Sequence, residues 1–123
     1  MYWVNKTSRK IVLINRDTDT EEVFWPTPPE QFVQILNKEI GEGPLGVPLY
    51  LSTYGDLVEK LPPLKDVNYI VSRIVAAACP RKDFYFVTDI DTKRSSSRVI
   101  YAHALTRSVG RKEWESYVSY YHD

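Results

Sequence analysis

Short apolar runs, separated by polar turns, dominate the hydrophobic pattern of this 123-residue chain. β-Branched and aromatic residues fill these runs, and such residues favour strands. The polar segment Arg16–Thr20 between the first two runs predicts a β-hairpin. The pattern predicts strands at Lys10–Asn15, Glu22–Trp25, Val47–Thr53, Asn68–Ser72, Asp83–Thr88 and Arg98–Leu105.

Two segments carry helix signals. Ser72 can cap a short alanine-rich helix over Arg73–Cys79, and Pro80 would end it. The segment Lys112–Tyr121 predicts a terminal helix, since its spacing gathers aromatic residues on one face. That face would hold Trp114, Tyr117, Val118 and Tyr121.

The segment Gln31–Ile40 is ambiguous. One helical face would collect four apolar side chains, and a weaker alternation of period two would instead indicate a strand. Periodicity alone slightly favours the helix. The helical face would hold Phe32, Ile35, Leu36 and Ile40, and the strand face Phe32, Gln34 and Leu36.

Strands outnumber helices in this pattern, which predicts an α+β fold that is mostly β. We expect an antiparallel sheet or sandwich, or a small open barrel, with one or two short helices. The length suits one domain. We therefore expect a single β-rich domain over residues 1–110 and a helical or docking extension over residues 111–123.

Composition excludes several partners. The 16 basic and 16 acidic residues give a net charge of +0, which favours neither duplex nucleic acid nor an anionic membrane. The longest apolar run, Ile74–Cys79, is far shorter than the ~20 residues that span a bilayer. Cys79 is the only cysteine, so an internal disulfide is impossible and a reducing cytoplasm is the expected location.

Four segments together resemble a group of small, largely uncharacterised phage and bacterial proteins. The most specific is Tyr69–Asp83, Y-I-V-S-R-I-V-A-A-A-C-P-R-K-D, which is similar to the group's Y-I-V-S-x-x-V-A-x-A-x-P-x-R-x-D stretch. The weaker matches are Asn5–Ile11, Thr53–Pro62 and Ala104–Arg107. The resemblance implies a phage-type protein in the cytoplasm of an infected host cell, and a strand rather than a helix at Gln31–Ile40.

The opening of the chain departs from that group, whose members begin N-L-T-P-H-x-(I/V). The group's Pro-His pair is Ser8-Arg9 in this chain. An arginine keeps its proton at physiological pH and binds no metal, so a histidine's catalytic role would be lost here. A cationic contact to an anion would survive the exchange.

Catalytic, metal and cofactor motifs are missing from the sequence. His103 and His122 are the only histidines, with no metal-binding spacing, and neither common nucleotide-binding glycine loop occurs. Asp89 and Asp91 lie in a polar loop where turn formation is the expected role. We therefore expect no catalytic residue, no metal ligand and no cofactor.

An anion site is the remaining chemistry. Arginine binds phosphate through two hydrogen bonds, tyrosine stacks on bases, and a helix start attracts anions. The structural alternative is an Arg81–Asp83 ion pair and a plain Ser72 cap. Tyr50 is a further stacking candidate. The candidate ligand-binding residues are Asn5, Thr7, Arg9, Tyr54, Tyr69, Ser72, Arg73, Arg81 and Asp83.

Three functions follow as hypotheses. The first is a phage-type binding protein, a homo-oligomer that sequesters a small nucleotide-like ligand such as a host immune signal. The second is a hydrolase of such nucleotides, with Asp83, His103 or Asp56 as general acid or base. The third is a protein-interaction or virion-associated module that docks through Trp114, Tyr117 and Tyr121.

Overall fold

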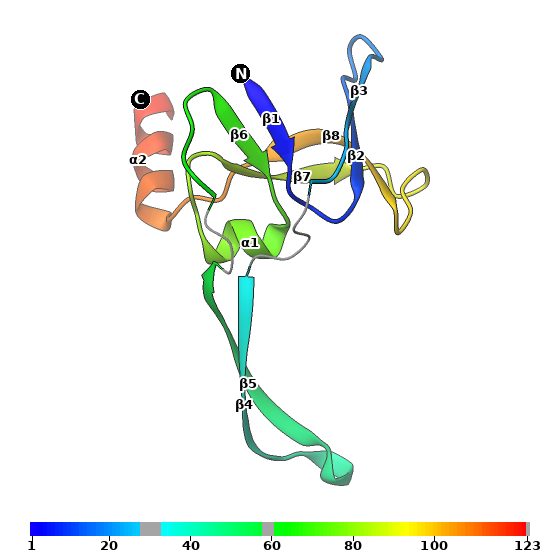
Figure 1. Cartoon of the computed structure of the whole chain (residues 1–123). Coiled ribbons are helices and arrows are strands. Elements are labelled where there is room, and N and C mark those ends of the chain that lie inside the picture. The colour runs from blue at the N-terminus through cyan, green and yellow to red at the C-terminus, as the bar shows by residue number, and fades with distance from the viewer. Residues whose placement is uncertain (28–32, 58–60, 123) are drawn as a thin grey trace.

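The structure is a computed structural model that describes residues 1–27, 33–57 and 61–122. The described residues form a six-stranded sheet, a separate two-stranded hairpin and two short helices (Figure 1). The sheet has the order β1-β6-β7-β8-β2-β3. Its strands are β1 (Tyr2–Asn5), β2 (Lys10–Ile14), β3 (Glu21–Phe24), β6 (Val67–Ile70), β7 (Phe84–Ile90) and β8 (Val99–Thr106). The other elements are β4 (Val33–Glu42), the 3₁₀ turn η1 (Pro44–Gly46), β5 (Pro48–Leu57), α1 (Arg73–Ala78) and α2 (Arg111–His122).

The six-stranded sheet curls until its two edges nearly meet. Asn5 at the end of the edge strand β1 forms a parallel bridge with Pro26, just after the other edge strand β3. The Asn5 amide also donates to the carbonyl of Phe24 at 2.9 Å. The mostly β content, the two short helices and the small open barrel are thus confirmed.

Strand directions in the barrel are mixed. β1 with β6, β6 with β7 and β2 with β8 are parallel, whereas β7 with β8 and β2 with β3 are antiparallel. An antiparallel sheet therefore describes only part of the barrel. The apolar pattern of a strand reports which face is buried and carries no information on the direction of its neighbour.

Both faces of the sheet are buried at the end of β6, which explains the apolar run Tyr69–Val71. Tyr69 and Val71 lie on the face that α1 covers, within one core cluster. Ile70 points to the opposite face, since successive strand residues alternate, and it is fully buried like Ile11 and Ala102. The cluster under α1 consists of Leu61, Tyr69, Val71, Val75, Ala76, Phe84 and Phe86.

The local signals for α1 are confirmed. The Ser72 hydroxyl accepts from the backbone N–H of Val75 at 3.3 Å, which caps the first turn. The helix ends before Cys79, and Pro80 follows it. The predicted hairpin is likewise confirmed by the antiparallel pairing of β2 with β3. Strand β1 was not predicted, because its four residues are too few to show a period.

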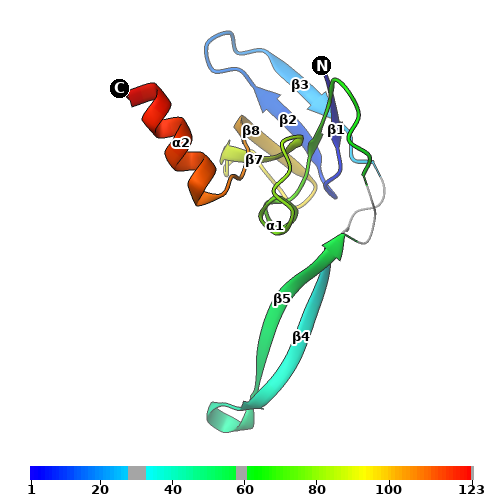
Figure 2. The same ribbon diagram turned by 90° about the vertical axis from the view of Figure 1, so that its left-hand side faces the viewer.

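The hairpin β4–β5, which we call the arm, extends away from the barrel (Figures 1 and 2). The ambiguous segment Gln31–Ile40 is therefore a strand from Val33 onward, as the resemblance implied. Gln31 and Phe32 lie outside the described residues. The helical periodicity was misleading because neither face of the arm's outer part is buried. Without a buried face, the apolar spacing is not tied to the strand period.

The helix α2 ends the described chain and lies beside the barrel (Figure 2). It packs only loosely, as the exposure of Trp114 and Tyr117 shows. Of the helices in the described ranges, none is both long and apolar enough for a membrane crossing. The domain division expected at residue 110 stays a prediction.

Candidate functional site

Three of the predicted ligand residues leave the sheet at one end. β1 and β6 run parallel with Asn5 opposite Ile70, so the segments that follow them emerge side by side. The first segment carries Arg9 and the second carries Ser72 and Arg73. Both arginines are exposed. This end of the barrel therefore offers two cations and one hydroxyl, although the hydroxyl already caps α1.

Arg81 and Asp83 lie at the other end of the sheet, before β7 begins. The Arg81 guanidinium donates through Nε to Asp83 Oδ1 at 2.9 Å and through Nη2 to Oδ2 at 2.6 Å. Its Nη1 donates to the Leu61 carbonyl at 2.7 Å, and its Cζ lies 4.3 Å from the centre of the Phe84 ring. These contacts match the structural alternative considered for this pair. They tie the chain before β6 to the start of β7.

Asn5 and Thr7 hold the loop between β1 and β2. Asn5 is 2% exposed, and its amide donates to the carbonyls of Arg9 at 2.7 Å and Phe24 at 2.9 Å. Its Oδ1 accepts from the Thr7 backbone N–H at 2.9 Å and from the Thr7 hydroxyl at 2.7 Å. Each donor and acceptor of this buried amide is thus used inside the protein, as buried polar groups require.

Two of the three predicted stacking tyrosines, Tyr54 and Tyr69, lie in different parts of the molecule. Tyr69 is 4% exposed, donates its hydroxyl to the Pro62 carbonyl at 2.9 Å and packs edge-on against Phe84. It therefore belongs to the core and presents no face to a ligand. Tyr54 lies in β5 of the arm, and its side chain is outside the part that the structure describes.

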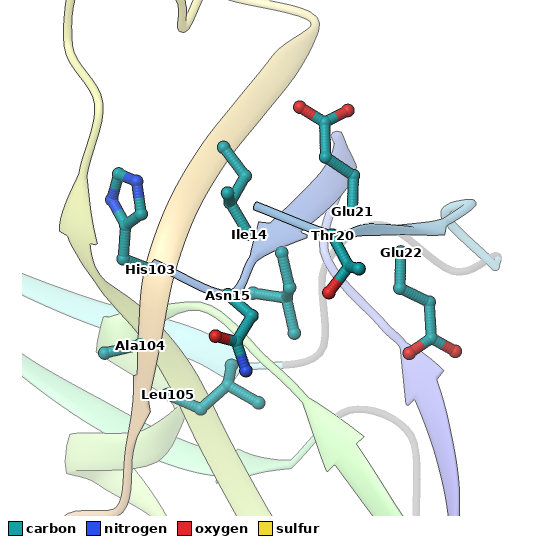
Figure 3. A pocket seen from close by; sticks show the side chains of 9 residues that line it. Ile14, Asn15, Thr20, Glu21, Glu22, His103, Ala104 and Leu105 are labelled. Carbon is teal, nitrogen blue, oxygen red and sulfur yellow. The ribbon is translucent and has the colours of Figure 1, made fainter. Parts of the chain in front are cut away.

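An open cavity of about 590 Å³ lies between β2, β3 and β8 (Figure 3). The carboxylates of Glu21 and Glu22 point away from each other in it. Glu21 accepts from Arg94 Nη1 at 3.1 Å, and this hydrogen bond raises the pKa of the Arg94 guanidinium. None of the predicted ligand residues lines this cavity. Its lining is Leu13, Ile14, Asn15, Thr20, Glu21, Glu22, His103, Ala104 and Leu105.

The acid–base groups of the hydrolase hypothesis do not converge. His103 Nδ1 lies 3.1 Å from the carbonyl of Asp89, six residues beyond Asp83 along β7. At ~3.3 Å per strand residue this separates the two groups by about 20 Å. The side chain of Asp56 is outside the described part. Within the described residues no three His, Cys, Asp or Glu side chains are grouped to hold a metal ion.

The arm is an amphipathic ribbon. Residues directly opposite each other share a face, so Leu36 with Thr53, Lys38 with Leu51, and Gly41 with Leu49 lie on one side. The other side carries Asn37 hydrogen-bonded to Ser52, and Glu39 opposite Tyr50. We call the side with three leucines the arm face; its leucines are Leu36, Leu49 and Leu51, between 43% and 60% exposed.

A second cavity, the α2 pocket, has a volume of about 270 Å³ and is formed where the chain enters α2. Trp114 and Tyr117 supply its aromatic side and are 56% and 60% exposed. Arg107 and Glu113 form an ion pair of 3.1 Å along it. Val109 completes the lining. Partly exposed Trp, Tyr and Arg side chains around a hollow are typical of protein interfaces.

Sequence reasoning singled out Trp114 and Tyr117 but not the arm face. The signal was present, because Leu49 and Leu51 alternate with Tyr50 and Ser52. That alternation indicated a strand with one apolar side, but not that this side stays uncovered. Comparison of the chain with known protein families, curated proteins and solved structures finds no match. The site must therefore be interpreted from its own geometry.

Proposed function

We propose that this chain is a non-catalytic protein-interaction module that assembles with itself through the arm. The observation that carries the proposal is the arm face, a row of leucines on a hairpin that leaves the barrel. Every residue from 36 to 53 is exposed except the half-buried Gly43. Exposed apolar side chains gathered on one face are typical of a site of protein contact.

The free energy of folding supports the same conclusion. A two-stranded hairpin without a third strand or a covered face is marginally stable in water. Ten residues in each strand make an arm of about 33 Å at ~3.3 Å per residue. Covering the exposed half of three leucines would add about 2–4 kcal/mol per arm. A partner that covers the arm face would therefore stabilise both the arm and the complex.

The open edges of the arm favour protein binding as well. In the described structure, β4 and β5 pair only with each other, so each has one edge without a neighbouring strand. Open edges are places where another chain can add a strand. The barrel, by contrast, brings its own edges together at Asn5 and Pro26. Self-assembly would occur in the cytoplasm of an infected cell if the phage-type resemblance holds.

Capture of a small nucleotide-like ligand is a second candidate function. The observation that favours it is the shared exit of the Arg9 loop and the Ser72–Arg73 segment at one end of β1 and β6. Two exposed guanidinium groups there can bind a phosphate, since arginine offers paired donors. Arg81, Asp83 and Tyr69 contribute to this candidate only through the fold, because internal contacts occupy them.

Sedimentation equilibrium of the purified chain over a wide concentration range tests the proposed assembly. The wild-type protein should show a mass above the monomer that rises with concentration. The double variant Leu49→Ser/Leu51→Ser should remain monomeric with an intact barrel. The matched control Asn37→Ala/Ser52→Ala alters the polar side of the arm and should assemble like the wild type. A wild-type protein that stays monomeric throughout would refute the proposal.

A further inference from the structure

The tip of the arm presents a leucine in an unfavourable backbone conformation. Leu45 has a φ of 59° and a ψ of 20°, in the left-handed region, and its side chain is fully exposed. Among the described residues, the other non-glycine residues with positive φ are all aspartates, which tolerate this region well. Leucine does not, and its fully exposed side chain packs against no other described residue. Its placement therefore points to a role outside the chain.

The tip is held in shape by backbone hydrogen bonds. Gly43 and Val47 are joined by the bond from the Gly43 N–H to the Val47 carbonyl at 2.7 Å. Gly46 donates to the Gly43 carbonyl, and Val47 donates to the Pro44 carbonyl, both at 3.2 Å. The turn is thus a defined structure that holds the Leu45 side chain outward. A preformed knob of this kind loses little conformational entropy on binding.

We propose that Leu45 of one copy enters the α2 pocket of a second copy of this chain, a contact that rests on the proposed self-assembly. The pocket of about 270 Å³ is larger than the four-carbon side chain of leucine. Trp114 provides a flat apolar surface that is still 56% exposed. The hollow can therefore accommodate the knob, and the Trp114 ring offers it an apolar surface.

The contact has to join two molecules. Figures 1 and 2 both place the tip of the arm, at η1, far from α2. A tip cannot reach the pocket of its own chain. The contact is also heterologous, because it joins different surfaces of the two copies, and it therefore extends from copy to copy into a ring or a filament.

Charge supports a second copy as the occupant. Glu42, next to the tip, is exposed, and so is Lys112 at the start of α2, where Arg111 is already paired with Glu115 at 3.0 Å. A tip that approaches the start of α2 brings opposite charges together. The chain has a net charge of +0, so whole copies do not repel each other.

Two variants test the contact by complementation. Leu45→Asn removes the knob and replaces it with a residue that accepts the left-handed conformation. Trp114→Ala removes one wall of the pocket. Each variant alone should assemble at least about tenfold more weakly, as expected for a central interface residue. Mixed together, they retain one intact knob and one intact pocket, and the mixture should recover association through a one-to-one heterodimer.

Exposed residues elsewhere provide the controls. Leu64→Ser and Trp25→Ala remove an exposed leucine and an exposed tryptophan outside the arm and α2, and both should assemble like the wild type. Sedimentation velocity measures all of these proteins and the mixture. If Leu45→Asn and Trp114→Ala assemble normally while Leu49→Ser/Leu51→Ser does not, the arm functions as proposed and this contact is wrong. A mixture that forms no heterodimer would also overturn it.

Discussion

Arg81 and Asp83 form a two-pronged ion pair at the entrance to β7, with N···O distances of 2.9 and 2.6 Å. The pair is mostly shielded from solvent, since its side chains are 26% and 18% exposed. Arg81 also donates to the Leu61 carbonyl. Arg81 and Asp83, two positions apart in sequence, thereby connect the segment before β6, the core under α1 and the first residue of β7.

Removing this arginine should destabilise the barrel. We expect Arg81→Ala to lower the free energy of unfolding by about 2 kcal/mol, because a shielded carboxylate and a carbonyl lose their charged donor. Arg16→Ala, which breaks the exposed pair with Asp89, should have a clearly smaller effect. Chemical denaturation of both variants measures the difference. Equal effects would contradict the structural role of Arg81.

The buried amide of Asn5 should be among the most sensitive positions. Asn5→Ala removes the donor from two carbonyls, those of Arg9 and Phe24, at the point where the barrel edges meet. We expect a loss of about 2–4 kcal/mol in unfolding free energy, since the Phe24 carbonyl and the Thr7 backbone N–H both lose the amide that binds them. Asn68→Ala, at a half-buried asparagine on β6, serves as the control and should cost much less. Thermal unfolding distinguishes them, and a tolerant Asn5 would show that the barrel closes without this amide.

Capture of a nucleotide-like ligand can be tested independently of self-assembly through the arm. If a cyclic dinucleotide or an ADP-ribose derivative binds at the end of β1 and β6, Arg9→Ala/Arg73→Ala should weaken binding at least about tenfold, through loss of two charged donors. Tyr69→Phe should leave the affinity unchanged because the ring is in the core. Calorimetric titration measures both.

Heating the loaded protein then releases the ligand for chemical identification. Intact ligand supports sequestration, whereas conversion to products would favour the hydrolase hypothesis. Absence of binding to any tested nucleotide would remove this candidate and leave the assembly proposal unaffected.

The strain at Leu45 has a local consequence. In dilute, monomeric protein, Leu45→Asn should stabilise the tip by about 1 kcal/mol, because the left-handed conformation costs asparagine less than leucine. Hydrogen exchange at the Val47 amide, which donates to the Pro44 carbonyl, should become slower. Leu45→Ala keeps a side chain that disfavours this conformation and should exchange like the wild type. Equal exchange in both variants would argue against strain.

Local sequence signals were sufficient where the chemistry is local. The Ser72 cap, the end of α1 before Pro80 and the hairpin of β2 with β3 all depend on residues a few positions apart. Arg81 and Asp83 are equally close in sequence, and their spacing by itself indicates an ion pair as the structural alternative to a ligand site. In each case the interacting groups are neighbours in the chain, so their pattern is visible without the fold.

The segment Gln31–Ile40 shows where periodicity fails. Its apolar spacing suited a helix slightly better than a strand, because an arm that projects into solvent buries no face in its outer part. The resemblance to phage and bacterial proteins favoured a strand, and the structure has one from Val33 to Glu42. Periodicity reports burial, so it carries little information where burial is incomplete.

By itself, the sequence determined that this chain is mostly β, where most of its strands and helices lie, and that Trp114 and Tyr117 share one side of α2. Only the tertiary structure decided that Tyr69 is in the core, that Arg9 and Arg73 leave one end of the barrel while Arg81 lies at the other, and that the arm face stays uncovered. The physical reason is the distance along the chain over which each interaction acts. Propensities, caps and turns act between near neighbours, whereas burial depends on which distant strands become adjacent.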